Sequence, residues 1–354
     1  QIRTIPLEGR GVDLGELTAG EIGALYGLGD VRVGQVIGDR ALLPRRVAIG
    51  ELSTPLLMVK ITPDDPSKKA ELKAALTLLS AEDPLLSAEE YNQELHIRVM
   101  GAIQLEILKE LIATRFDLAI EFGAPNVIYR ETIRQSAVGF YAYTMPKPCW
   151  AVIKFQIDPL PRGSGIQYES VVPAREIMPR YQHQIEQALP MALRQGMLGW
   201  WVDDVKITLI GGEHHLIHTH PLDFIVATPV ALLDGLKRGG SVLLEPILEM
   251  KLIAPEDAGG KLLGEIIAMR GELVASERSG ALLQVKALVP LKTSVNFSTR
   301  FAALTGGRGA MSVRLHGYKA CDEEITCPRR GVHPLDTAKY ILAARSALEG
   351  GIFD

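Results

Sequence analysis

The sequence predicts an α+β fold of several domains, because one order of elements, β-α-β-β-α-β, occurs twice along its 354 residues. The two copies cover residues 47–125 and 244–323, and a central α+β unit, 126–243, separates them. This order is typical of ferredoxin-like modules. A chain of this length can bury several hydrophobic cores. We therefore expect separate domains, with two ferredoxin-like domains flanking the central one.

Residues 1–46 are predicted to form the end of a small β-barrel. Short apolar runs are broken by glycines in this segment, and no helical period is present. The expected strands are 2–5, 22–26, 31–33 and 36–37.

The first ferredoxin-like module begins where the hydrophobic pattern changes, after residue 56. Alternating apolar residues predict strands, and leucines at helical spacing predict helices. The pattern gives strands at 57–61, 95–100 and 116–122, and helices at 66–80 and 102–114. One strand of the order is missing from the pattern, and we place it near Leu86 or Tyr91.

The central unit has longer elements than its neighbours. Its predicted strands are 127–134, 150–157, 168–172 and 205–210, and its predicted helices are 177–198 and 224–236. Pro190 lies inside the first of these helices, which predicts a kink there. Arg238 and two glycines mark the end of the second helix.

The second ferredoxin-like module repeats the order of the first. Its predicted strands are 248–253, 271–275, 282–289 and 310–315, and its predicted helices are 255–269 and 294–305. Ser279 and Gly280 predict a hairpin turn between the two middle strands. Residues 324–354 form a C-terminal extension with an amphipathic helix at 334–348.

Composition and charge limit the classes of protein to which this chain can belong. The chain is 47% hydrophobic and 23% charged, as in ordinary globular proteins. No apolar run approaches eighteen residues, so we expect no membrane partner. The net charge of −4 counts against DNA binding, although local basic loops can still contact phosphate. Three cysteines, without a paired motif, favour reduced thiols in a cytoplasmic protein. We expect the protein to be a monomer.

A histidine-rich loop between a strand and a helix is the first candidate site. It holds His214, His215, Leu216, Ile217, His218, Thr219 and His220. Loops at such positions often carry function. Imidazole rings can stack on RNA bases or bind phosphate, and neutral imidazoles also bind zinc. The spacing lacks the helical His pair of known zinc enzymes. A solvated loop tip without function is the third alternative.

A second candidate is the turn formed by Pro161, Arg162, Gly163, Ser164 and Gly165. Its glycines can bring backbone amides close to a phosphate, although such clusters are usually turns. Arg329 and Arg330 add a small basic patch in the C-terminal extension. Gly259-Gly260-Lys261 is followed by leucine, so it is not a nucleotide-binding P-loop. No nucleophile and base can be paired, so we assign neither catalytic nor metal-binding residues.

Several stretches together resemble the C-terminal part of a translational GTPase of the elongation factor G type, and most of all the tetracycline ribosomal protection proteins. The stretches that carry the resemblance are 42–45, 80–86, 101–107, 127–132, 159–170, 195–200 and 243–246. The tail, with Cys327-Pro-Arg-Arg330 and a helix holding Asp336, Lys339 and Tyr340, resembles the extra C-terminal helix of the protection proteins.

The resemblance implies the domain organisation and the binding residues. Residues 1–46 would end domain II, residues 47–125 would be domain III, and residues 244–323 would be domain V. Domain IV, 126–243, would have a fold like domain 2 of ribosomal protein S5. RNA would be bound by residues 161–165 and 214–220 and by Arg329, Arg330, Lys339 and Tyr340.

The resemblance also implies a partner and a mechanism. The family binds the ribosome at the A site, and the tip of domain IV reaches 16S rRNA in the decoding region and dislodges tetracycline. GTP and Mg²⁺ would bind a GTPase domain that precedes Gln1. The sequence begins at Gln1 without an initiator methionine, so we expect it to be a fragment.

The tip differs from that of the well-known protection proteins, which read Tyr-Tyr-Ser-Pro-Val-Ser-Thr where this chain has residues 214–220. The elongation factor has a histidine at the position of His215. Two alternatives therefore stay open: an elongation factor G paralogue that acts in tRNA translocation, and a metal-binding module built on the histidine cluster.

Overall fold

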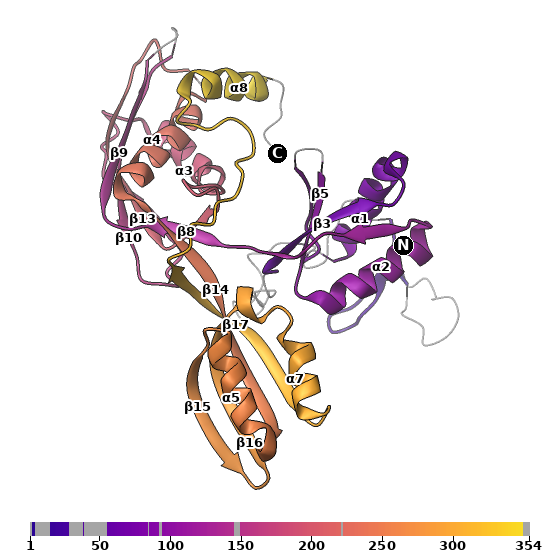
Figure 1. Cartoon of the computed structure of the whole chain (residues 1–354). Helices are drawn as coiled ribbons and strands as arrows, with labels where there is room; N and C mark the ends of the chain where they lie inside the picture. Colours follow the sequence, from indigo (N-terminus) through magenta and orange to yellow (C-terminus); the bar gives the residue numbers. More distant parts are fainter. Residues whose placement is uncertain are drawn as a thin grey trace. The chain divides into compact units, whose positions relative to one another are not determined.

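The computed structural model describes residues 2–3, 15–27, 38, 55–83, 85–91, 94–144, 149–220 and 222–349. The chain forms two compact units, 1–125 and 126–354 (Figure 1). None of the described helices is both long and apolar enough to cross a membrane.

The first unit contains the predicted β-α-β-β-α-β order. Its elements are β3 (Leu57–Pro63), α1 (Lys69–Glu82), β4 (Ala88–Tyr91), β5 (Glu94–Val99), α2 (Ala102–Phe116) and β6 (Ile120–Phe122), with a 3-10 turn, η3 (Pro66–Lys68), before α1. The strands lie in the order β4-β5-β3-β6. The strand missing from the sequence pattern is β4, which ends at Tyr91, one of its two predicted places.

The segment predicted as the end of a barrel is largely outside the described residues. Two short strands, β1 (Ile2–Arg3) and β2 (Ala24–Leu25), pair antiparallel and fall within the predicted strands 2–5 and 22–26. The strands predicted at 31–33 and 36–37 lie outside the described residues. The barrel itself stays a prediction.

A mixed four-stranded sheet forms the body of the second unit (Figure 1). Its strands are β9 (Ala137–Tyr143), β10 (Ala151–Pro159), β11 (Ile166–Ser170) and β13 (Val205–His214), in the order β11-β13-β10-β9. Two helices, α3 (Pro179–Ala192) and α4 (Asp223–Gly239), pack on this sheet and form a common hydrophobic core with it. The C-terminal helix α8 (Thr337–Glu349) joins the same core through Ile341 and Ala344.

A second sheet carries the repeated module. It joins β12 (Trp201–Val202), β8 (Arg130–Ile133), β14 (Ser241–Pro255), β16 (Leu282–Pro290), β15 (Glu272–Ser279) and β17 (Ala310–Cys321). Its helical segments are η4 (Glu256–Ala258), α5 (Gly259–Ala268), α6 (Leu291–Ser294) and α7 (Phe297–Thr305). The predicted turn at Gly280 is present, with φ at +63°. β14 pairs with β8 at its start, with β17 from Leu243 and with β16 from Ile247, so one strand connects both parts of the unit.

The structure corrects several predicted elements. The strand predicted at 127–134 is two strands, β7 (Asn126–Val127) and β8. The helix predicted at 294–305 is α7, which begins only at Phe297, after the short α6. The helix predicted at 177–198 ends at Ala192, so Pro190 lies in its last turn and not at a central kink. The chain leaves the helix because Gly199, at φ +84°, and the Glu131 carboxylate fix a turn after it.

Glu131 is a buried carboxylate on β8 of the second unit. It is 1% exposed, and its Oε2 accepts a hydrogen bond of 2.7 Å from the Leu198 amide. A Cβ on Gly196 would lie 2.0 Å from its Oε1, so the turn leaves just enough room for the carboxyl group. Burial raises the pKa of Glu131 from 4.5 to about 7.

We expect this carboxyl to make stability fall as the pH rises. Between pH 4.5 and 7 the folded chain retains a proton that the unfolded chain has released, so the free energy of unfolding decreases through that window. The full loss is about 3 kcal/mol. Urea unfolding at pH 5 and pH 8 should show most of this loss in the natural chain and not in Glu131→Gln. Glu277→Gln, on an exposed strand, should retain it; equal pH dependence in all three chains would contradict the expectation.

Candidate functional site

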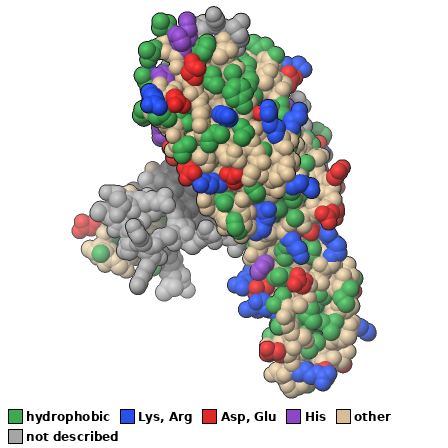
Figure 2. Space-filling view, turned by 90° about the vertical axis from the view of Figure 1, so that its left-hand side faces the viewer, with side chains coloured by type: hydrophobic (Ala, Val, Ile, Leu, Met, Phe, Trp, Pro, Cys, Tyr) green, Lys and Arg blue, Asp and Glu red, His purple; other side chains and the backbone are tan. Residues whose placement is uncertain are grey.

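The histidine-rich loop lies at one end of the four-stranded sheet. β13 continues through Gly211 and Gly212 to His214, further than predicted, and α4 begins at Asp223. In the sheet register His214 is opposite Ala151, the first residue of β10. Figure 2 shows histidine side chains beside hydrophobic ones at this end of the second unit.

Hydrogen bonds within the loop close it into a compact turn. The His215 amide donates to Thr219 Oγ1 over 2.8 Å, and Thr219 Oγ1 donates to the Trp150 carbonyl over 2.6 Å. The amides of Ile217 and His218 each donate to His215 Nδ1 over 3.2 Å. The loop therefore has an internal scaffold and a direct link to the start of β10.

The histidine rings face protein groups. His214 Nδ1 lies 2.8 Å from the Glu176 carbonyl, and its ring packs on Tyr181. The His215 ring lies between Trp150 and His218, with ring centroids 5.4 and 4.4 Å away. His220 Nδ1 lies 2.9 Å from the His218 carbonyl. The RNA contacts expected of His214 and His215 stay a prediction; in the structure both rings contact protein groups that support the loop.

The outward side chains of the loop are aliphatic. Leu216 is 80% exposed and Ile217 is 77% exposed. Exposed aliphatic residues are ordinary when scattered singly, but two adjacent ones at the end of a closed turn form a small apolar tip. The sequence contains a signal for this apolar pair, since both residues interrupt a polar run of histidines and threonine. We refer to Leu216 and Ile217 as the apolar tip.

The turn at 161–165 does not join this tip. Pro159 is opposite Val205 in the register, so the turn follows the end of β10 that is far from His214. Arg162 pairs with Asp204 Oδ2 over 3.2 Å, and the Gly165 amide donates to Asp204 Oδ1 over 3.0 Å. The sheet thus separates the two predicted RNA-binding segments.

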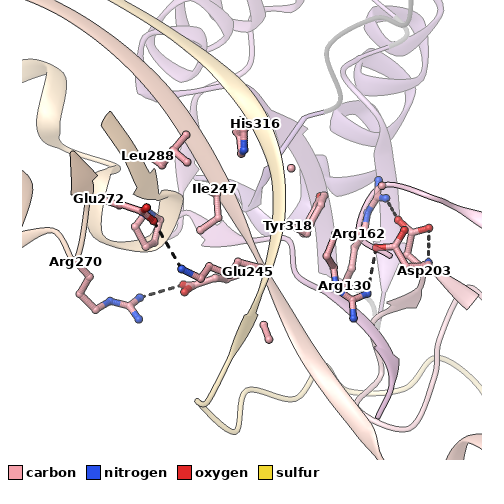
Figure 3. Close-up of a pocket in the computed structure, with 16 residues that line it drawn as sticks. Arg130, Arg162, Asp203, Glu245, Ile247, Arg270, Glu272, Leu288, His316 and Tyr318 are labelled. Atoms are coloured by element: carbon pink, nitrogen blue, oxygen red, sulfur yellow. Dashed lines mark hydrogen bonds and ion pairs between the residues drawn. The ribbon is translucent and has the colours of Figure 1, made fainter. Parts of the chain in front are cut away.

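Arg162 and Gly163 instead line a cleft of ≈ 570 Å³. Figure 3 shows its charged side chains in pairs: Arg130 with Asp203, and Arg270 with Glu245 over 3.0 Å. The Arg130 guanidinium also lies over the Tyr318 ring, 4.5 Å from its centroid. Arg130 and Tyr318 come from β8 and β17, so these contacts stabilise the junction between the two parts of the unit.

Of the residues in the C-terminal extension that were predicted to bind RNA, some contact the rest of the protein and others are on the surface. Arg329 donates to the Gly196 carbonyl over 2.6 Å. Tyr340 packs, partly buried, against the hydrophobic core, and this burial raises its pKa to about 12. Lys339 is 77% exposed and pairs with Asp336 over 3.1 Å. The Arg330 amide donates to Gln195 Oε1 over 3.0 Å, and the residue is exposed. Arg329 and Tyr340 therefore hold the extension in place, while Lys339 and Arg330 are on the surface.

The loop does not offer the ligand set that the metal-binding alternative needs. Across the described part of the chain, no three His, Cys, Asp or Glu side chains group closely enough to hold a metal ion. The glycine pair before Lys261 does not form a nucleotide-binding P-loop either. Gly259 and Gly260 begin α5, but Leu262 stands where a phosphate loop needs Ser or Thr, and it is buried.

Comparison with protein families identifies the class of protein. Residues 52–124 match elongation factor G domain III, residues 125–240 match domain IV, and residues 242–327 match the elongation factor G C-terminus. These regions include both β-α-β-β-α-β modules and the sheet that carries the tip. The chain therefore belongs to the elongation factor G family, of which it carries these three regions.

Its relatives include tetracycline resistance proteins. The chain is 33% identical to the tetracycline resistance protein TetP of Clostridium perfringens, over 95% of this chain and 52% of that protein. It is 29% identical to TetM from transposon Tn916 of Enterococcus faecalis, over 88% of this chain and 49% of that protein. The chain thus spans about half the length of these relatives.

A solved structure shares the fold. A crystal structure of a protein from Thermus thermophilus superposes with a TM-score of 0.63 and 28% identity, covering 82% of this chain and 44% of that one.

Proposed function

We propose that this chain is the ribosome-binding region of a tetracycline ribosomal protection protein. In this proposal domain IV enters the decoding region of the small subunit at the A site, and its apolar tip contacts 16S rRNA and dislodges the drug. The observation that carries the proposal is the apolar tip itself, held on a closed turn in a chain similar to TetP over 95% of its length.

The geometry of the loop suits contact with an unpaired base. A turn that is already closed by its own hydrogen bonds loses little conformational entropy when it docks. Burying an exposed leucine or isoleucine side chain is worth roughly 1.5–3 kcal/mol, and every base offers a flat face against which it can be buried. Leu216 and Ile217 carry no charge, so this part of the binding free energy should vary little with salt. Phosphate contacts elsewhere, for which Arg330 and Lys339 are exposed, should weaken with salt.

The energy source in this proposal is outside the chain. We expect GTP and Mg²⁺ to bind a further domain of the whole protein, where the GTP would be hydrolysed. The catalytic residues of that step would then lie on that domain.

A second function has specific support. All three matched regions are those of elongation factor G, and the resemblance places a histidine at the position of His215 in that factor. A paralogue that promotes tRNA translocation is therefore the alternative to drug protection.

One experiment separates the two functions. The full-length protein is added with GTP to ribosomes that hold labelled tetracycline, and in parallel to ribosomes that hold tRNA before translocation. Protection predicts rapid release of the drug and no movement of tRNA. Movement of tRNA without release of the drug would reject protection in favour of translocation, and activity in neither assay would reject both.

A further inference from the structure

We propose that Asp223 and Arg345 are positioning residues that set the shape of the tip loop from behind. Asp223 begins α4, and Arg345 lies on α8. Their ion pair connects the C-terminal extension to the loop that carries the apolar tip. The inference deepens the proposed function and depends on it only for the activity measurement.

The Asp223 carboxylate joins two segments that come from different parts of the chain. Its Oδ2 accepts hydrogen bonds from the Trp150 amide over 3.0 Å and from the His220 amide over 2.9 Å. The side chain is only 3% exposed. A buried carboxylate with two backbone donors fixes both amides, because leaving either donor unpaired in the interior is unfavourable. Asp223 thereby holds the end of the tip loop against the start of β10.

Arg345 neutralises this carboxylate. Its Nη2 lies 3.5 Å from Asp223 Oδ1, and its guanidinium lies over the ring of buried Tyr143, 5.6 Å from the centroid. Asp223 is the buried member of this pair, while the Arg345 side chain is 35% exposed, and removing the partner of a buried charge is unfavourable. Without Arg345 the carboxylate would turn toward water and release the amides of Trp150 and His220.

The backbone just before Asp223 has a strained conformation that neighbouring contacts must hold. Leu222 has φ at +78°, in the left-handed region that residues other than glycine rarely adopt. Such a conformation persists only where neighbouring contacts over-determine it. The Asp223 amide bonds to the His220 carbonyl over 3.3 Å across this residue, so the carboxylate and the strained residue belong to one turn.

The loop shape then follows from α8 in three steps. Arg345 holds Asp223, Asp223 holds the Trp150 and His220 amides, and Thr219 Oγ1 binds the Trp150 carbonyl on one side and the His215 amide on the other. Each step is a hydrogen bond or ion pair to the next segment. The C-terminal extension is thus a support for the apolar tip, in addition to any contact that it makes by itself.

Amide hydrogen exchange in the 354-residue chain tests the inference. Arg345→Met should speed exchange of the amides at 215–220 by about tenfold or more, while amides in the first unit exchange as before. Arg345→Lys should restore most of the protection because it keeps the charge. Asp223→Asn should give the same local loss, since its amide group would face the guanidinium.

The matched control is Arg238→Met. Arg238 also pairs with an aspartate, Asp234, over 2.9 Å, but it lies at the far end of α4. It should leave exchange at 215–220 unchanged. Unchanged exchange at 215–220 in Arg345→Met, or an equal increase in Arg238→Met, would overturn the positioning role.

Drug release distinguishes a failure of this inference from a failure of the proposed function. In the full-length protein, Arg345→Met should slow release of tetracycline about tenfold, and Arg345→Lys should recover it. If exchange at 215–220 increases but release is unaffected, the positioning role stands and the proposed function of the tip is wrong. If exchange does not change, the positioning role is wrong whatever the rate of release.

Discussion

Replacing both Leu216 and Ile217 by serine is expected to slow tetracycline release by the full-length protein roughly ten- to hundredfold, the range that corresponds to about 1.5–3 kcal/mol for the burial of one aliphatic side chain. The melting temperature should not change, because the two side chains are 80% and 77% exposed and contribute little to the core. The loop should also keep its shape, since its closing hydrogen bonds come from backbone groups, His215 and Thr219. Release is measured as loss of labelled drug from ribosomes.

The matched control for this pair is Ile267→Ser. Ile267 is 75% exposed on α5, away from the tip, so its replacement removes an aliphatic side chain as exposed as either tip residue. It should leave release unaffected. Release at the natural rate by the double serine variant would show that the apolar tip does not act on the drug site.

Gly139→Ala is expected to destabilise the second unit by about 3 kcal/mol or more, because the backbone of β9 touches the backbone of α4. A Cβ on Gly139 would lie 2.1 Å from the Ala231 carbonyl oxygen and 2.8 Å from the Gly235 nitrogen. Neither atom belongs to a flexible side chain, so the helix itself would have to move. Because α4 carries Asp223 at its first turn, the tip loop should lose its shape too.

Urea unfolding followed by tryptophan fluorescence measures this effect, and Gly211→Ala supplies the control. At Gly211 the nearest atom to a new Cβ is 3.9 Å away, and its φ is not in the left-handed region. The free energy of unfolding of that variant should stay within about 1 kcal/mol of the natural value, as expected of an uncrowded site. Equal stability of the two variants would contradict the close approach of helix and sheet.

Much of the fold was predictable because its elements have clear periods. The order of elements in both modules follows from the alternation of apolar residues and from leucine spacing. These patterns can be read within a short stretch of sequence, without knowledge of distant contacts. β9 was missed because Gly139 interrupts it and lowers the strand signal, although glycine is there for contact with α4. The helix predicted to reach 198 was too long because Leu193, Met197 and Leu198 continue its apolar spacing. Glu131, more than sixty residues earlier in the chain, fixes the turn that ends it.

The candidate site was predictable in place but not in orientation. A histidine-rich segment between a strand and a helix indicated the loop. Which way each ring faces depends on Glu176 and Trp150, which are distant in sequence and come close only in the folded sheet. Arg162 likewise pairs with Asp204, forty-two residues away. The pair of Asp223 and Arg345 has no local signal, because it depends on the docking of α8 onto domain IV.

Contact between the apolar tip and RNA is tested most directly by cleavage from the tip itself. Ile217→Cys in the full-length protein would carry a tethered iron chelate that cleaves RNA nearby; the native Cys149 and Cys321 are buried and Cys327 is partly buried, so each should be blocked or replaced by alanine. With the protein bound to the ribosome, we expect cleavage of 16S rRNA in the decoding region, beside the tetracycline site. Cleavage confined to other regions, or none while the protein remains bound, would contradict the claim that this tip reaches the drug.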